Sequence, residues 1–379
     1  MDFEIFKKIV ESCHLNFLIG SGASKPFLGT LGEIENLLTD LAKSNIEKDE
    51  RTVLDSSIKK KYWDVAIKGN MDIYDSNRGK LKITKQNYSE FYNSVNTILL
   101  KRKTNLISKQ ANVFTTNMDL FNEYTIESLQ FVYNDGFSGR IRPVFSTSNF
   151  SNSVKKTTNY FEYQSELPLF NLYKLHGSLN WMMSDNEEVL YDNNLMLLET
   201  IHKIIIPTED LLEIEYSKEV DGKEQWFTFS IEELYKNLTN QMVKKKKVHS
   251  DFLAAYDKLV MINPTKEKFE STTRKLVFYE LLRMYSNILE KENSVLFVLG
   301  FSFADEHIRE ITLRVAKANP TLLVVIFAHT PEAKDLIEKS IGKRNNIFFI
   351  YDENISFSLD KITENYFGKL ATELKSGKE

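Results

Sequence analysis

The first stretch whose residue types suggest chemistry is a glycine-rich turn made of Gly20, Ser21, Gly22, Ala23 and Ser24. It follows an apolar run, 15–19, which is typical of a buried strand. Glycines placed after such a strand let backbone N–H groups approach a phosphate. The spacing departs from GxGxxG, since position 25 is lysine, and it lacks the Gly-Lys-Ser/Thr ending of a P-loop. A tight turn in any α/β protein therefore remains an alternative interpretation.

A second polar stretch, Thr115-Thr116-Asn117-Met118-Asp119, follows the β-prone residues 113–114 and precedes a predicted helix from Leu120. Open α/β sheets bind ligands at the carboxyl ends of their strands, so these side chains are candidates for a ligand site. The alternative is that Asn117 or Asp119 only caps the helix.

Two shorter stretches complete the set. His176-Gly177 ends the predicted strand 172–175, and Gly300-Phe301-Ser302 ends the predicted strand 295–299. A lone histidine is more often structural than catalytic. This one stands at a strand end beside a glycine that permits close ligand approach, which favours a role in chemistry.

The elements around these stretches predict an α/β fold. Thr30 and Glu33 have the spacing of a capping box before a helix that reaches Leu41. The run 321–328 is almost wholly apolar, which indicates a parallel sheet covered on both faces. We expect a Rossmann-like parallel sheet with an additional, mostly α-helical module. The expected domains are a discontinuous sheet domain at 1–181 and 291–358, a helical insertion at 182–290, and a C-terminal helix and tail at 359–379.

The composition limits the classes of protein. The 379 residues carry a net charge of −4, whereas dedicated nucleic-acid binders usually have a basic excess. The lysine run 244–247 is most simply a solvated surface. No apolar run approaches the ~20 residues of a membrane helix. Cys13 is the single cysteine, which excludes a disulfide within the chain and a cysteine zinc cluster. The N-terminus lacks the layout of a signal peptide, so we expect a cytoplasmic protein.

In this order, the four polar stretches resemble the motifs of the sirtuin family of NAD-consuming enzymes. The glycine-rich turn resembles the family's GAGxS, 115–119 resembles TQNxD, His176-Gly177 resembles the catalytic HG, and 300–302 resembles the ribose-contacting GTS. The run 300–308, GFSFADEHI, resembles the bacterial sirtuin-like proteins of antiviral defence. Some of those proteins form complexes with a HerA-type ATPase.

The sequence also departs from the deacylases of that family. It reads KPFLG at 25–29 where they have the GIPxFR continuation, and Thr116 replaces the glutamine of TQN. The four-cysteine zinc ribbon, which helps to form their peptide cleft, cannot exist with one cysteine. These differences leave NAD chemistry plausible and disfavour peptide deacylation.

The resemblance implies NAD+ as substrate and no metal. Asn117 would hold the ribose and a reactive water, Asp119 would bind the nicotinamide carboxamide or stabilise positive charge, and His176 would act as base. The glycine-rich turn would carry the pyrophosphate and Ser302 an adenosine ribose. The residues expected to bind NAD+ are Gly20, Ser21, Gly22, Ala23, Ser24, Thr116, Asn117, Asp119, Gly300, Phe301 and Ser302.

The function implied is an NAD+ glycohydrolase that depletes NAD in abortive-infection defence. The alternatives are an NAD-dependent protein-lysine deacylase and a non-enzymatic NAD or ADP-ribose sensor. We expect a homo-oligomer, with a HerA-type ATPase as candidate partner. The apolar helix positions Leu276, Tyr279 and Leu282 are predicted either to pack on the chain's own core or to form such an interface.

Overall fold

The computed structural model of the chain describes residues 2–29, 34–102, 107–157, 164–220, 223–262 and 272–377. The predicted capping box of Thr30 and Glu33 lies outside these ranges. The chain divides into two compact units. The first unit comprises Met1–Phe27, Ile73–Gly177 and Leu276–Glu379, and the second comprises Leu28–Asp72 and Ser178–Lys275.

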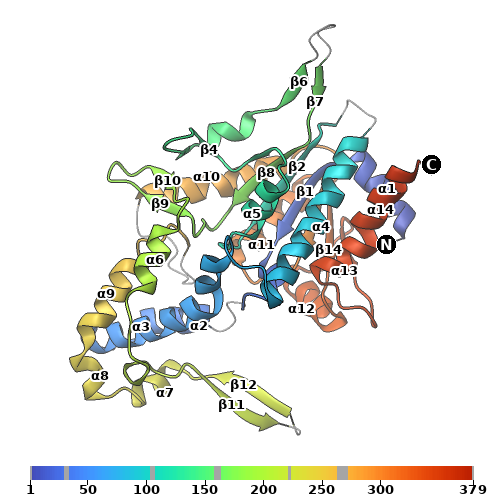
Figure 1. Cartoon of the computed structure of the whole chain (residues 1–379). Helices are drawn as coiled ribbons and strands as arrows, with labels where there is room; N and C mark the ends of the chain where they lie inside the picture. The colour runs from blue at the N-terminus through green and yellow to red at the C-terminus, as the bar shows by residue number, and fades with distance from the viewer. Residues whose placement is uncertain are drawn as a thin grey trace. The chain divides into compact units, whose positions relative to one another are not determined.

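A parallel seven-stranded sheet forms the centre of the first unit, which confirms the predicted α/β class (Figure 1). Its strand order is β15-β14-β13-β1-β2-β8-β3. The strands are β1 (His14–Ile19), β2 (Gln110–Thr115), β3 (Tyr133–Asn134), β8 (Leu169–Lys174), β13 (Ser294–Leu299), β14 (Leu323–Phe327) and β15 (Ile347–Ile350). From β1 the chain first adds β2 and β8 on one side and later adds β13, β14 and β15 on the other. The strand order therefore reverses between β1 and β13.

Aromatic side chains fill the space on both faces of this sheet. On one face, Phe297 of β13 stacks with Phe17 of β1, and the ring of Phe367 lies 5.2 Å from that of Phe297. On the other face, Phe114 of β2 lies 4.8 Å from Tyr285. The first face is covered by α1 (Phe3–Ser12), α4 (Gly79–Lys101) and η6 (Thr363–Phe367), and the second by α10 (Thr272–Leu289) and α11 (Glu306–Ala318). Coverage of both faces explains why the strands are almost wholly apolar.

The remaining elements of the first unit are short. They are η1 (Ser21–Ser24), α5 (Phe121–Ser128), β4 (Phe137–Ser138), β5 (Val144–Phe145), η4 (Thr147–Ser151), β6 (Lys155–Thr157), β7 (Gln164–Glu166), α12 (Pro331–Ile341), α13 (Leu359–Ile362) and α14 (Gly368–Ser376). Helices α13 and α14 pack against α4. The C-terminal segment, expected as a separate helix and tail, thus belongs to the core of the first unit.

The second unit combines helices with two β-hairpins. Its elements are α2 (Ile34–Lys43), α3 (Lys48–Tyr62), η2 (Trp63–Ile67), η3 (Lys68–Asp72), β9 (Trp181–Met183), β10 (Val189–Tyr191), α6 (Met196–His202), η5 (Thr208–Asp210), β11 (Glu215–Val220), β12 (Lys223–Thr228), α7 (Ile231–Lys236), α8 (Asn240–Lys244) and α9 (Lys246–Tyr256). Helix α3 packs against α9, and Lys59 Nζ lies 3.1 Å from Asp257 Oδ1. The helical module expected at 182–290 therefore shares its core with 28–72, and most of α10 belongs to the first unit.

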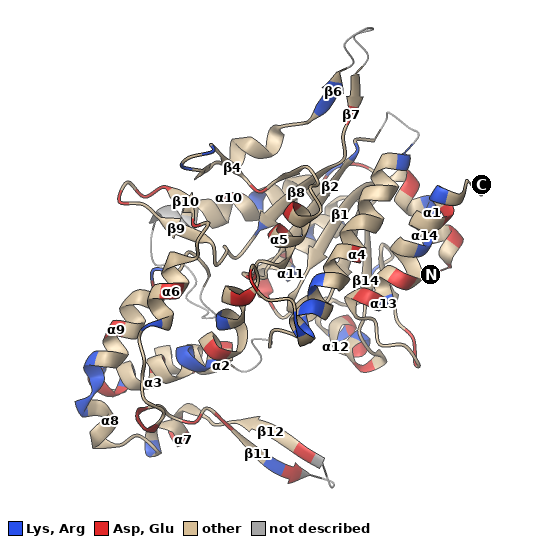
Figure 2. Cartoon of the chain, viewed as in Figure 1, with Lys and Arg blue, Asp and Glu red and all other residues tan. Residues whose placement is uncertain are grey.

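The lysine run 244–247 forms a basic segment at the junction of α8 and α9 (Figure 2). Lys245 Nζ lies 2.8 Å from Asp210 Oδ2, and Lys246 Nζ lies 2.5 Å from Asp49 Oδ2. The pair of Lys246 with Asp49 is solvated, as expected of a surface helix, whereas Lys245 pairs with an aspartate that is only 1% exposed. Among the helices in the described ranges, none has the length and apolar character needed to cross a membrane.

Candidate functional site

The four polar stretches follow four adjacent strands of the sheet, β13, β1, β2 and β8. Because these strands are parallel, their carboxyl ends meet at the same edge. The reversal of strand order lies between β1 and β13, and ligands of open α/β sheets bind in the crevice outside such a point. Stretches that lie far apart in the sequence are thus brought together at the position where this fold binds ligands.

The turns after β1 and β13 pack directly on each other. The Gly22 amide donates to the Gly300 carbonyl over 3.0 Å. A Cβ atom built on Gly20 would lie 2.5 Å from the Gly300 oxygen, and one built on Gly300 would lie 2.5 Å from the Ala23 nitrogen. Gly300 also has φ +61°, a conformation that side chains other than glycine rarely adopt.

This packing uses some of the backbone groups that were expected to meet a phosphate. The amide of Ala23 donates to the Gly20 carbonyl over 3.0 Å, and the amide of Gly22 is occupied as described above. The glycines therefore serve the contact between the two turns. Binding of the NAD+ pyrophosphate by this turn stays a prediction. It would require hydrogen-bond donors other than the amides of Gly22 and Ala23.

A buried hydrogen-bond network joins the turn after β1 to the stretch after β2. The Ser24 hydroxyl donates to Asp119 Oδ2 over 2.5 Å and lies 3.0 Å from the Tyr88 hydroxyl. The side-chain nitrogen of Asn117, Nδ2, donates to the backbone carbonyl of Gly20 over 3.0 Å. Ser24, Asn117 and Asp119 are only 1%, 7% and 4% exposed. The network fixes Asn117 and Asp119 in place before any ligand binds.

Asp119 also takes part in the start of the next helix. Its Oδ1 atom accepts a hydrogen bond from the Phe121 amide at the first residue of α5. Both carboxylate oxygens are thus engaged within the protein. This bond satisfies one free amide at the start of α5, although the N-cap position itself is Leu120. The contact of Asp119 with nicotinamide stays a prediction.

Charge is buried beneath this stretch. Lys174, the last residue of β8, lies 3.1 Å from Glu123 Oε1 and donates to the backbone carbonyl of Asp119. Burial raises the pKa of Asp119 above its ordinary value, and the positive charge of Lys174 acts in the opposite direction. Burial likewise raises the pKa of Tyr88 well above its ordinary value, so Tyr88 is a neutral hydrogen-bonding group here.

His176 faces an acid that the sequence did not single out. Its Nε2 atom lies 3.2 Å from Asp305 Oδ2, and the two side chains are 15% and 9% exposed. The other oxygen of Asp305 accepts a hydrogen bond from the Ile308 amide over 3.0 Å and so caps α11. The available signal was an aspartate, an N-cap residue type, shortly before the helical spacing of Ile308, Ile311 and Val315.

The remaining predicted residues lie at the same edge of the sheet. Thr116 and Phe301 are half-buried and Ser302 is exposed. The Ser302 hydroxyl accepts a hydrogen bond from the Ala304 amide over 3.4 Å. Sequence reasoning missed Lys174, Asp305 and the polar role of Tyr88, which lies in the middle of α4.

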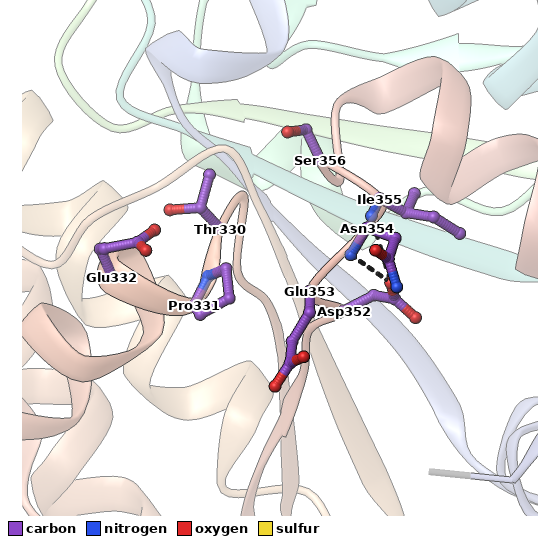
Figure 3. Close-up of a pocket in the computed structure, with 8 residues that line it drawn as sticks. All are labelled: Thr330, Pro331, Glu332, Asp352, Glu353, Asn354, Ile355 and Ser356. Atoms are coloured by element: carbon purple, nitrogen blue, oxygen red, sulfur yellow. Dashed lines mark hydrogen bonds between the residues drawn. The ribbon is translucent and has the colours of Figure 1, made fainter.

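A pocket of about 420 Å³ lies further along this edge, beyond β14 and β15 (Figure 3). Asp352 Oδ1 accepts hydrogen bonds from the backbone amides of Asn354 and Ile355, and these bonds hold the turn that forms one wall of the pocket. The pocket is lined by Thr330, Pro331, Glu332, Asp352, Glu353, Asn354, Ile355 and Ser356. None of these residues belongs to the predicted set.

Comparison with known proteins adds no family assignment. No protein-family model matches the chain, and no curated protein matches it at a significant level. The function is therefore inferred from the residues and geometry of the sheet edge.

Proposed function

We propose that the chain is an NAD+ glycohydrolase that cleaves NAD+ to nicotinamide and ADP-ribose. One observation carries this proposal: four stretches that resemble sirtuin motifs end four adjacent strands around the reversal between β1 and β13. A dinucleotide lying along this edge would have its nicotinamide riboside near Asn117 and His176. Its pyrophosphate would lie over the end of β1, and its adenosine would lie toward Ser302 and the pocket beyond β14.

The reaction suits a site of this kind. The C1′–N bond breaks through an oxocarbenium-like transition state, and its electrons pass to nicotinamide, which leaves as a neutral molecule. No strong acid is needed, so positioning and preorganised polar groups would supply most of the acceleration. Water then adds to C1′ and gives its proton to His176. The buried network around Asn117 supports this account, because preorganised groups do not have to reorder during the reaction.

A biological role in antiviral NAD depletion, with assembly into a homo-oligomer or with a HerA-type ATPase, belongs to the same proposal. An enzyme that empties the NAD pool would kill its host if it were always fully active, so we expect the isolated chain to turn over NAD+ at a measurable basal rate and assembly to raise that rate. Leu276 and Tyr279 on α10 are 60% and 63% exposed, and Leu282 is half-buried. Exposed apolar side chains at this helical spacing support a contact with a second molecule.

The test is incubation of the purified chain with NAD+, with and without an acetylated peptide, while nicotinamide, ADP-ribose and free lysine peptide are quantified. We expect nicotinamide and ADP-ribose in equal amounts without peptide, and their loss in His176→Ala. His202→Ala is the matched control, because His202 is an exposed histidine of α6. Turnover only with peptide would identify a deacylase, binding without turnover would identify a sensor, and neither binding nor turnover would refute the proposal.

A further inference from the structure

We propose that Asp305 is a positioning residue that holds His176 with its Nε2 protonated and its Nδ1 free to act as the base. The catalytic consequence rests on the proposed NAD+ glycohydrolase function. The contact itself does not depend on that function. Nothing in the resemblance to sirtuins assigns a role to Asp305.

The contact between these residues spans the site. His176 follows β8 and Asp305 lies on the loop after β13, while β1 and β2 lie between those two strands. Neighbouring strands are ~4.8 Å apart, so the ends of β8 and β13 are separated by roughly 14 Å. At least one of the two loops must cross the ends of β1 and β2 to bring Nε2 within 3.2 Å of Oδ2. The contact therefore closes over the carboxyl edge that the turn at 20–24 and the stretch at 115–119 follow.

Asp305 is held in one orientation by its second bond. Oδ1 accepts the Ile308 amide at the start of α11, a helix of 13 residues, while Oδ2 faces the imidazole. A carboxylate fixed at one oxygen presents the other at a defined place. The pair is largely buried, so the interaction is screened less by solvent than it would be at the surface.

The chemistry follows from the single N–H of a neutral imidazole. Nε2 lies 3.2 Å from a carboxylate oxygen, and a carboxylate accepts hydrogen bonds and does not donate them. In a neutral ring this contact favours the proton on Nε2, which leaves the lone pair on Nδ1. When Nδ1 takes the proton of the attacking water, the imidazolium gains its positive charge beside a negative carboxylate. No electron transfer is involved. Asp305 does not touch the reacting atoms and acts only through His176.

Asp305→Asn separates the two roles of this residue. Asparagine caps helices about as well as aspartate, so α11 should keep its start. The variant removes the negative charge that faces Nε2. We expect a melting temperature within a few degrees of wild type, a KM for NAD+ within a few fold, and a kcat lower by ~10²–10⁴-fold. Asp305→Glu, which keeps the charge and disturbs the cap, should regain part of kcat while it lowers stability.

The decisive readout needs no NAD+. Nitrogen-15 NMR of the His176 ring, assigned with His176→Gln, should show the Nε2-protonated tautomer in wild type and a mixture in Asp305→Asn. An unchanged tautomer, or an unchanged kcat in a folded Asp305→Asn variant, would overturn the proposal. If wild type does not cleave NAD+, the glycohydrolase proposal fails, and the NMR comparison still decides whether Asp305 controls His176.

Discussion

Replacing Gly300 with alanine tests whether the turns after β1 and β13 are in close contact. The substitution places a side chain at φ +61°, which costs about 1–2 kcal/mol. The new Cβ would also lie 2.5 Å from the Ala23 nitrogen, a backbone atom that cannot move without shifting the turn at 20–24. Overpacking of this kind costs about 1–3 kcal/mol. We therefore expect Gly300→Ala to lower the free energy of unfolding by about 2–5 kcal/mol.

Gly79→Ala provides the matched control. Gly79 has φ +51°, and a Cβ built on it meets nothing within 4 Å, so only the backbone strain of about 1–2 kcal/mol is expected. Tryptophan fluorescence would not report on the sheet, because Trp63, Trp181 and Trp226 all lie in the second unit. Far-UV circular dichroism during urea unfolding, with hydrogen exchange of peptides from β1 and β13, is the suitable assay. Equal destabilisation by the two substitutions would refute the close contact.

Three further predictions concern the site and its surroundings. Asn117→Ala should stay folded and lose ~10²–10³-fold in NAD+ turnover, because one positioned polar group is removed; near-wild-type nicotinamide release would contradict its role. Chelation with EDTA should leave turnover unchanged, since a neutral leaving group needs no Lewis acid, and a loss restored by a divalent ion would count against that mechanism. Burial raises the pKa of Asp135 from 3.8 to about 6, so the folded state favours the neutral carboxyl group over the carboxylate. The free energy of unfolding therefore falls as the pH rises through this range and the group ionises. Asp135→Asn keeps an acceptor for the Phe137 amide and should stabilise the fold by about 1–3 kcal/mol at pH 7.5 and by almost nothing near pH 3, as followed by urea unfolding; equal effects at both pH values would exclude this cause.

Most strands of the sheet and the polar stretches that follow them were predictable because both depend on local pattern. The exception in its bounds is β8 (Leu169–Lys174), which begins three residues before the expected strand 172–175 and ends one residue earlier. Apolar runs bounded by glycine or polar residues marked β1 and β13 within one residue of their observed bounds. The division into two units was not predictable in this way. It depends on contacts between distant segments, such as Lys59 with Asp257, which no local pattern encodes.

The hairpins of the second unit were missed for a different reason. Strand β11 reads EYSKEV, in which charged residues outnumber apolar ones, so its sequence does not resemble a buried strand. The buried charges of the site were also beyond local reasoning. Whether Lys174 or Asp305 is paired depends on which strand ends become neighbours, and that is a property of the completed sheet.

The most direct test of the central claim is a crystal structure of Asn117→Ala soaked with NAD+. The slowed variant should retain the intact dinucleotide at the carboxyl edge of β13, β1, β2 and β8. The nicotinamide ribose should lie beside His176 and the adenosine beyond Gly300. A dinucleotide bound elsewhere on the chain, or an edge left empty at NAD+ concentrations that saturate wild-type turnover, would contradict the account.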